Sequence, residues 1–155
     1  MQDTDLAWLA GIMEGEGTFA IYHQVRKTSK NGPSGQLRGC VSLTNTDPTL
    51  INKAYEIFMS LGVEMHIHEY KNKKGSTRPV YDMQTAQQSK VKLICEKLLP
   101  FLYGEKKAKA EMLLRFVTKR LDKGKAPYDE DDWKSFREFR SSETTREAST
   151  VLVPL

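Results

Sequence analysis

The chain has 155 residues, of which 39% are hydrophobic and 28% are charged, and this composition predicts one globular domain with its own core. No apolar run reaches the roughly 20 residues that a membrane-spanning helix needs, and no basic segment precedes an apolar stretch near the start, so neither a membrane span nor a signal peptide is expected. The net charge of +4 and the isoelectric point near 9.0 favour a polyanionic partner.

A first helix is predicted to begin with Thr4 or Asp5 as its cap and to end near Gly17. Its apolar stripe has helical spacing and consists of Leu6, Leu9, Ala10 and Met13. Another face carries almost no side chain, because every fourth residue there is small: Ala7, Gly11 and Gly15. Glycine inside a helix costs roughly 1 kcal/mol relative to alanine, so we expect another backbone to lie against this face.

After Gly17 the period changes from helical to alternating, which predicts a strand with one buried face. Its apolar side carries Phe19, Ile21 and Val25 and is interrupted by His23. A polar loop over residues 27–35 and a second alternating segment over residues 36–43 complete a long hairpin.

Asp47 and Pro48 are typical of a helix cap followed by proline at the first helical position, and Gly62 predicts the end of that helix. A second strand pair is predicted over residues 63–70 and 80–85, joined by a basic turn. Ser89 can cap a helix that ends near Pro100, and further helices are predicted over residues 106–121 and 131–140.

This order of elements predicts an α+β domain over residues 1–140, in which helices cover one side of an antiparallel sheet and polar residues occupy the other. Residues 141–155 are expected to form a tail. Several separated basic segments, at residues 26–30, 71–78, 106–109 and 119–125, suit a long phosphate backbone better than one compact site. Cys40 and Cys95 are expected to be free thiols of an intracellular protein, cytoplasmic or organellar rather than secreted.

Residues 9–17 read Leu-Ala-Gly-Ile-Met-Glu-Gly-Glu-Gly. This segment resembles the LAGLIDADG motif of homing endonucleases in its leading Leu-Ala-Gly, its alternating acidic and small residues and its closing glycine, although glutamates stand where the motif has aspartates. The predicted order of elements is similar too. The resemblance implies an αββαββα core with a saddle-shaped antiparallel sheet, followed by extra C-terminal helices.

The resemblance also implies an enzyme of intron homing, a site-specific endonuclease that cuts both strands of a long pseudo-palindromic DNA target. Because the chain carries one motif, it is expected to act as a homodimer, with Ala7, Gly11, Ile12 and Gly15 at the interface. Such an interface would bring the two Glu16 side chains together.

A glutamate at the C-terminal end of a helix faces the negative end of the dipole, and a divalent cation would compensate for this position. Glu16 and the carbonyl of Gly15 are therefore the expected metal ligands. Carboxylates that share metals beside a phosphate suit phosphodiester hydrolysis. Mg²⁺ is the expected cofactor, with Mn²⁺ as a substitute and Ca²⁺ as an ion that binds without supporting cleavage.

In the family, a polar residue at the end of the second strand positions the attacking water, and Asn45 occupies that place here. The resemblance also implies a lysine near the scissile phosphate, for which Lys106 is the preferred match and Lys53 a weaker one. Glu14 is expected to be structural.

The polar sheet face is expected to lie in the major groove, where a two-stranded ribbon fits and base edges offer donors and acceptors. The expected DNA contacts are Tyr22, Gln24, Arg26, Thr28, Lys30, Gln36, Arg38, Ser42, His66, His68, Tyr70, Lys73, Arg78, Asp82 and Gln84. Two alternatives remain: a maturase of the same fold that binds an intron RNA, and a DNA-binding regulator that has lost cleavage. The presence of Glu16 argues against the regulator.

Overall fold

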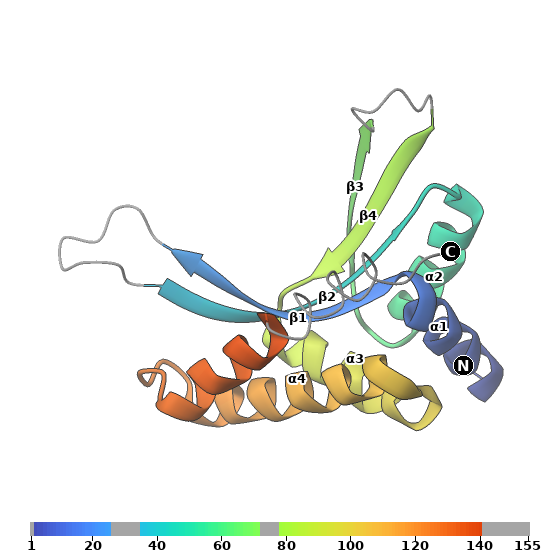
Figure 1. Ribbon diagram of the computed structural model, residues 1–155. Coiled ribbons are helices and arrows are strands. Elements are labelled where there is room, and N and C mark those ends of the chain that lie inside the picture. The colour runs from blue at the N-terminus through green and yellow to red at the C-terminus, as the bar shows by residue number, and fades with distance from the viewer. Residues whose placement is uncertain (1, 26–34, 72–77, 141–155) are drawn as a thin grey trace, which may run out of the picture.

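The computed structural model of the protein describes residues 2–25, 35–71 and 78–140 (Figure 1). The elements follow one another as α1 (Asp3–Glu16), β1 (Gly17–Val25), β2 (Gly35–Asn45), α2 (Pro48–Ser60), β3 (His66–Lys71), β4 (Pro79–Thr85), α3 (Gln88–Leu98), the 3-10 turn η1 (Leu99–Phe101) and α4 (Gly104–Lys123). A further helix covers residues 130–140. This order confirms the predicted αββαββα core with additional C-terminal helices.

The four strands form one antiparallel sheet in the order β1-β2-β4-β3. The hairpins β1–β2 and β3–β4 point in different directions from the middle of the sheet, which gives the sheet its saddle shape (Figure 1). The alternation of side chains assigns one set to each face. Phe19, Ile21, Val41, Leu43 and Met83 are buried under the helices, and the predominantly polar set occupies the other face.

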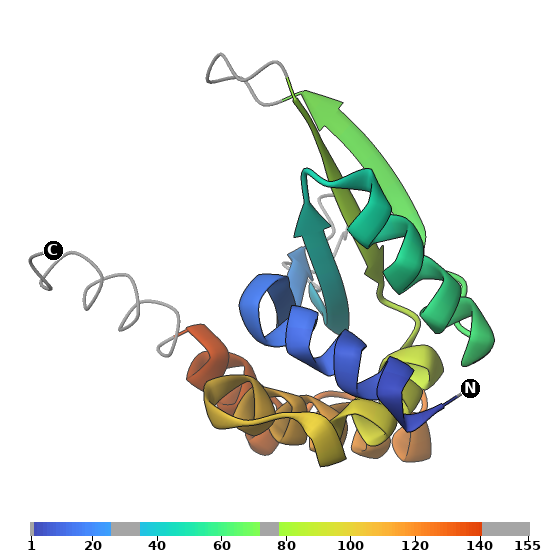
Figure 2. The ribbon, with the colours of Figure 1, turned by 90° about the vertical axis from the view of Figure 1, so that its right-hand side faces the viewer.

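The helices pack along one side of the sheet, α1, α3 and α4 near its centre and α2 beside the hairpin β3–β4 (Figures 1 and 2). In α4, Leu113, Phe116 and Val117 are buried in the core. Phe139 is buried as well, and the helix at residues 130–140 packs its aromatic side against the same core. None of the described helices is both long enough and apolar enough to span a bilayer.

Two predicted helix starts were wrong. Helix α1 begins at Asp3 with Gln2 as its cap, so Thr4 and Asp5 lie in the first turn; Asp3 and Asp5 stand there near the positive end of the dipole. Helix α3 begins at Gln88, not after Ser89. The cap of α2 is confirmed, because the Asp47 carboxylate accepts a hydrogen bond of 2.8 Å from the Thr49 N–H.

The two cysteines are free, as expected, and both are buried. Burial raises the pKa of the Cys40 thiol to about 11 and that of the Cys95 thiol to about 12. Both thiols are therefore protonated and unreactive at neutral pH. Cys40 belongs by strand parity to the polar face, but its neighbours bury it there.

Candidate functional site

Helix α1 has one buried face and one face of small, exposed residues. Leu9, Ala10 and Met13 are fully buried, whereas Ala7, Gly11 and Gly15 are exposed. A Cβ atom added at Gly11 or Gly15 would meet no atom within 4 Å. Contacts among the described residues therefore do not require these glycines, and nothing in the described part of the chain compensates for the helix-weakening effect of two glycines.

The exit from α1 requires glycine at position 17. Gly17 is buried and its N–H donates to the Met13 carbonyl, and a Cβ atom there would lie 2.8 Å from the Cα of Met13. The chain can thus pass from helix into β1 without a loop. Glu16 is the last helical residue and is exposed at this end of α1.

The two acids of the motif differ in their surroundings. The carboxylate of Glu14 accepts a hydrogen bond from the backbone N–H of Tyr103, which ties α1 to the start of α4. This contact supports the expected structural role of Glu14. Glu16 is left as the exposed acid at the helix end.

Lys106 reaches the same end of α1 from a position 89 residues away in sequence. Its side chain is 9% exposed, and its Nζ donates a hydrogen bond to the carbonyl oxygen of Gly17, directly after Glu16. A cation at the carbonyl end of a helix is favourably placed. Lys107 is exposed, so the structure distinguishes the two neighbouring lysines. Lys53 instead lies over the Trp8 ring, 4.4 Å from its centroid, beside the middle of α1.

Asn45 ends β2, and the strand register places it two residues beyond Leu43, which pairs with Gly17. Its Oδ1 accepts a hydrogen bond of 2.8 Å from the Asp47 N–H in the turn that leads into α2. The acceptor of the side chain is therefore used by the turn. A catalytic role of Asn45 would use its amide nitrogen.

The described strand residues that are predicted to meet DNA share the sheet face opposite the helices. The register aligns Gln24 with Gln36 and Tyr22 with Arg38 in one hairpin, and His66 with Gln84 and His68 with Asp82 in the other. Ser42, which pairs with Gln84, joins the two hairpins. A hollow of about 670 Å³ opens on this face, with Tyr22, Gln24, Arg38, His66 and Gln84 in its lining.

Residues 3–99 match the family described as the LAGLIDADG-like domain. The chain belongs to the LAGLIDADG family. The matched segment contains Glu16, Asn45 and the sheet, and it ends before Lys106. None of the curated proteins compared with the chain matches it.

Solved structures of homing endonucleases have the same fold. The homing endonuclease I-TnaI is 17% identical with a TM-score of 0.66, and the match covers 92% of this chain and 96% of that one. I-CvuI, crystallised with an I-CreI target in the presence of magnesium, is 21% identical with a TM-score of 0.53, over 76% of this chain and 68% of its own. The group I intron-encoded I-CeuI, complexed with DNA, is 19% identical with a TM-score of 0.56, over 78% and 56%.

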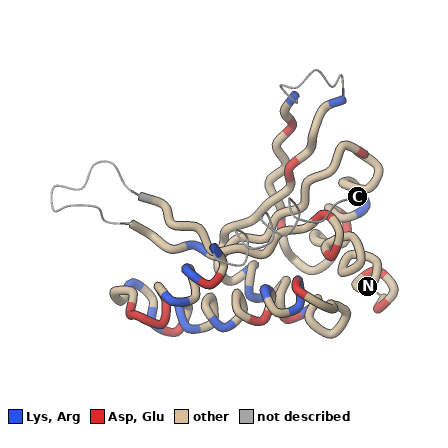
Figure 3. Tube along the Cα trace, in the orientation of Figure 1, with Lys and Arg blue, Asp and Glu red and all other residues tan. Residues whose placement is uncertain are grey.

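Four of the residues predicted to contact DNA lie outside the described part of the chain: Arg26, Thr28, Lys30 and Lys73. Arg78 is exposed directly before β4, and Lys71 ends β3, so basic side chains stand at the outer end of the hairpin β3–β4 (Figure 3). Tyr70 is exposed one residue before Lys71.

Thr44 also lies on the polar face, although it was not among the residues predicted there. Its Oγ1 donates a hydrogen bond of 3.0 Å to the Asp82 carboxylate on the paired strand. The alternation that selects Gln36, Arg38 and Ser42 reaches Thr44 if it is extended by one step, so the signal was present in the sequence.

The described residues contain no group of three or more His, Cys, Asp or Glu side chains that could hold a metal ion. At the end of α1 the donors are the Glu16 carboxylate and the last helical carbonyls, among them that of Gly15. These oxygen donors fit Mg²⁺, which is usually held by one or two carboxylates and completes its shell with water and substrate phosphates.

Proposed function

We propose that the chain is a site-specific homing endonuclease, which cleaves both strands of a long pseudo-palindromic DNA duplex by divalent-metal-dependent hydrolysis and acts as a homodimer. The observation that carries this proposal is the C-terminal end of α1, where the exposed residue Glu16 follows the open glycine face and directly precedes Gly17, whose carbonyl accepts a hydrogen bond from the Lys106 ammonium.

The glycine face supports the homodimer. Two copies of α1 can approach closely where Ala7, Gly11 and Gly15 carry almost no side chain, and half-buried Ile12 flanks this contact. A twofold contact through α1 would place the two Glu16 residues near the symmetry axis. A twofold dimer reads a target with the same symmetry, so we expect the target of this chain to be pseudo-palindromic.

The donor set at the helix end supports the metal. Glu16 and the Gly15 carbonyl would hold a Mg²⁺ ion, which when bound polarises the phosphodiester and lowers the pKa of a bound water. Lys106 adds positive charge beside the negative end of the helix and would offset the charge of a phosphate there. Asn45 would orient a water through its amide nitrogen. We expect Mn²⁺ to replace Mg²⁺ and Ca²⁺ to support binding alone.

The sheet face supports recognition of duplex DNA. Its exposed Gln, Arg and His side chains match base-edge donors and acceptors in the major groove. The homing endonucleases I-CvuI and I-CeuI, which have the same fold, were each solved in complex with DNA. We propose the same class of ligand for this chain.

The test is a selection from a randomised duplex pool, with Mg²⁺ or with EDTA, followed by cleavage assays on the selected site. The Glu16→Gln variant should still bind this duplex but lose cleavage. The loss should exceed the roughly 10–100-fold that is typical when a residue supporting a metal ligand is removed. Glu56→Gln, a change at an exposed acid of α2, is the matched control and should cut normally.

Each alternative has its own outcome. Binding of a preferred duplex without cleavage, with any divalent metal, would indicate a DNA-binding regulator. The absence of a preferred duplex would overturn the nuclease proposal and direct the test to intron RNA and a maturase activity. Equal cleavage by Glu16→Gln would remove Glu16 from the mechanism.

A further inference from the structure

Strand β2 loses one of its two partners halfway along its length. β1 pairs with β2 as far as Gly35, whereas β4 pairs with it only from Val41 to Asn45. Between Gly35 and Cys40, no described strand pairs with the side of β2 that faces away from β1. Successive residues of a strand direct their backbone N–H and C=O groups to alternate sides. The groups of Leu37 and Gly39 therefore lie on the same side of β2 as those of Val41 and Leu43.

Two side chains take the place of the missing strand. The Gln88 amide accepts a hydrogen bond of 3.1 Å from the Gly39 N–H and donates one of 3.0 Å to the Gly39 carbonyl. The Tyr128 hydroxyl accepts a hydrogen bond of 3.0 Å from the Leu37 N–H and donates one of 3.1 Å to the Leu37 carbonyl. Each side chain thus satisfies both backbone groups of one residue, as a paired strand would.

Gln88 is itself held in place. Its Nε2 also donates a hydrogen bond of 2.8 Å to the Ala86 carbonyl, between β4 and α3. A Cβ atom at Gly39 would lie 2.7 Å from Cγ1 of Val117 and 3.3 Å from Oε1 of Gln88. Glycine at position 39 therefore lets both α4 and the Gln88 amide approach the strand.

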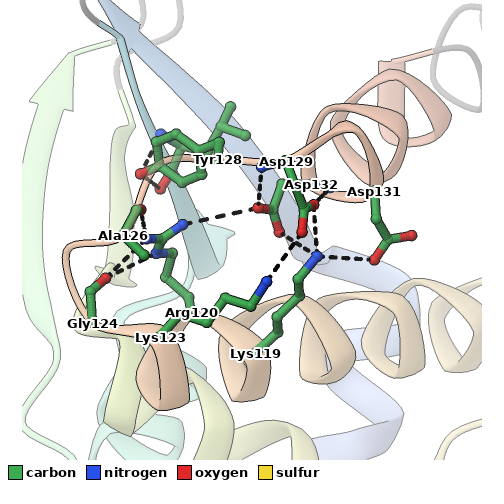
Figure 4. Close-up of polar contacts among 10 residues, drawn as sticks. Lys119, Arg120, Lys123, Gly124, Ala126, Tyr128, Asp129, Asp131 and Asp132 are labelled. Atoms are coloured by element: carbon green, nitrogen blue, oxygen red, sulfur yellow. Dashed lines mark hydrogen bonds and ion pairs between the residues drawn. The ribbon is translucent and has the colours of Figure 1, made fainter.

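Tyr128 is held by a charged network at the end of α4 (Figure 4). The guanidinium of Arg120 lies over the Tyr128 ring, 4.4 Å from its centroid, and donates a hydrogen bond of 2.9 Å to the Gly124 carbonyl. Arg120 also pairs with buried Asp132 at 3.9 Å. Asp129 and Asp132 each accept the other's backbone N–H, at 3.1 and 3.0 Å, which caps the helix at residues 130–140.

The two bridged residues alternate with the side chains that the proposed function assigns to DNA. Arg38 lies between Leu37 and Gly39, and Gln36 precedes Leu37; both are exposed on the face opposite the helices. Gln88 and Tyr128 hold the backbone of Gly39 and Leu37 in place, and this backbone sets the positions of the Gln36 and Arg38 side chains. A one-residue slip or a bend of the strand would move both away from their bases.

We propose that Gln88 and Tyr128 are positioning residues that fix the outer half of the hairpin β1–β2 and thereby set the base preference at the positions read by Gln36 and Arg38. This role rests on the proposed function, since it needs a preferred duplex. Arginine reads guanine and glutamine reads adenine through paired hydrogen bonds, which require the backbone to be accurately placed.

The experiment uses Tyr128→Phe and Gln88→Met, which remove the hydrogen bonds and keep most of the packing. The matched controls are Tyr55→Phe, a half-buried tyrosine of α2, and Gln87→Met, the exposed neighbour of Gln88. The first readout is amide hydrogen exchange of the protein alone. Exchange at Leu37 or Gly39 should accelerate in the corresponding variant, and exchange in β3 should stay unchanged.

The second readout is base-pair discrimination, measured by competition between the selected duplex and each of its single base-pair substitutions. The positions that depend on residues 36 and 38 are those at which Gln36→Ala and Arg38→Ala lose preference. At these positions Tyr128→Phe and Gln88→Met should lose roughly tenfold in discrimination, with other positions and the controls unchanged.

A discrimination profile equal to that of the wild type, or a loss spread evenly over all positions, would overturn the positioning role. Unchanged exchange at Leu37 and Gly39 would overturn the bridging of the strand edge. A wild-type protein without any preferred duplex would overturn the proposed function and the specificity role together, while the exchange data would still report on Gln88 and Tyr128.

Discussion

The exposed glycine face of α1 can be tested by filling it. Among the described residues, the methyl group of Gly11→Ala would meet no atom within 4 Å apart from the neighbouring backbone of its own helix. Replacing glycine by alanine inside a helix contributes about 1 kcal/mol of stability. For a chain of this length, 1 kcal/mol corresponds to a rise in Tm of about 2–4 °C. The variant monomer should therefore be more stable than the wild-type monomer.

The dimer should respond in the opposite direction. If two α1 helices meet through this face, each new methyl group overpacks the contact, which costs about 1–3 kcal/mol. Twofold symmetry doubles this to about 2–6 kcal/mol. At about 1.4 kcal/mol per tenfold change, the Kd of the dimer should rise by roughly thirtyfold to ten-thousandfold.

The measurements are sedimentation equilibrium over a concentration series and thermal unfolding in dilute, monomeric solution. Gly17→Ala is the control, because its methyl group would lie 2.8 Å from the Met13 Cα of the same chain and should lower the Tm of the monomer. A Gly11→Ala protein that dimerises as tightly as the wild type would refute the α1 interface. A lower monomer Tm for Gly11→Ala would refute the open space around that helix.

Two further predictions concern the charged network and the thiols. The pKa of Asp129 is lowered, and the main cause is its hydrogen bond of 2.7 Å with Lys119. The stability that Asp129 contributes is therefore fully present above its unfolded pKa of about 3.9, and it is lost as the pH falls through the folded pKa. The difference in urea-unfolding free energy between the wild type and Asp129→Asn should thus be largest at neutral pH and shrink below about pH 4. A difference that stays constant with pH would contradict the link between the lowered pKa and stability. Because burial raises the pKa of Cys40 to about 11 and that of Cys95 to about 12, a thiol reagent at pH 8 should label neither in the native protein and both after unfolding, as followed by mass spectrometry.

The local features of the fold could be predicted because they are written in short stretches of sequence. The alternation after Gly17, the Asp47-Pro48 start of α2 and the apolar stripe of α1 each depend on residues a few positions apart. The face of the sheet that carries the polar residues followed from strand parity alone. The motif at residues 9–17 then indicated the family, and the match over residues 3–99 confirms it.

Contacts between distant segments could not be predicted in this way. Tyr128 bonds to Leu37 over 91 positions and Glu14 to Tyr103 over 89, and no periodicity encodes such pairs. His23 shows the same limit: it interrupts the apolar side of β1, and its ring packs edge-on against Trp133 at 5.2 Å, in a helix far along the chain. Helix α3 starts two residues before the predicted position, and its first residue, Gln88, bonds to Gly39 of β2 over 49 positions.

Asn45 is the residue for which sequence and structure suggest different roles, and a pair of variants separates them. Its Oδ1 bonds to the Asp47 N–H, a purely structural use, while its place beyond Leu43 keeps it near the end of α1. Asn45→Asp keeps the acceptor and should fold as the wild type does, whereas Asn45→Ala loses it and should be destabilised by about 1 kcal/mol in urea unfolding. If the amide nitrogen orients a water, both variants lose cleavage of the selected duplex even though only one is destabilised, because neither retains an N–H donor. Full cleavage by Asn45→Asp would confine Asn45 to the turn before α2.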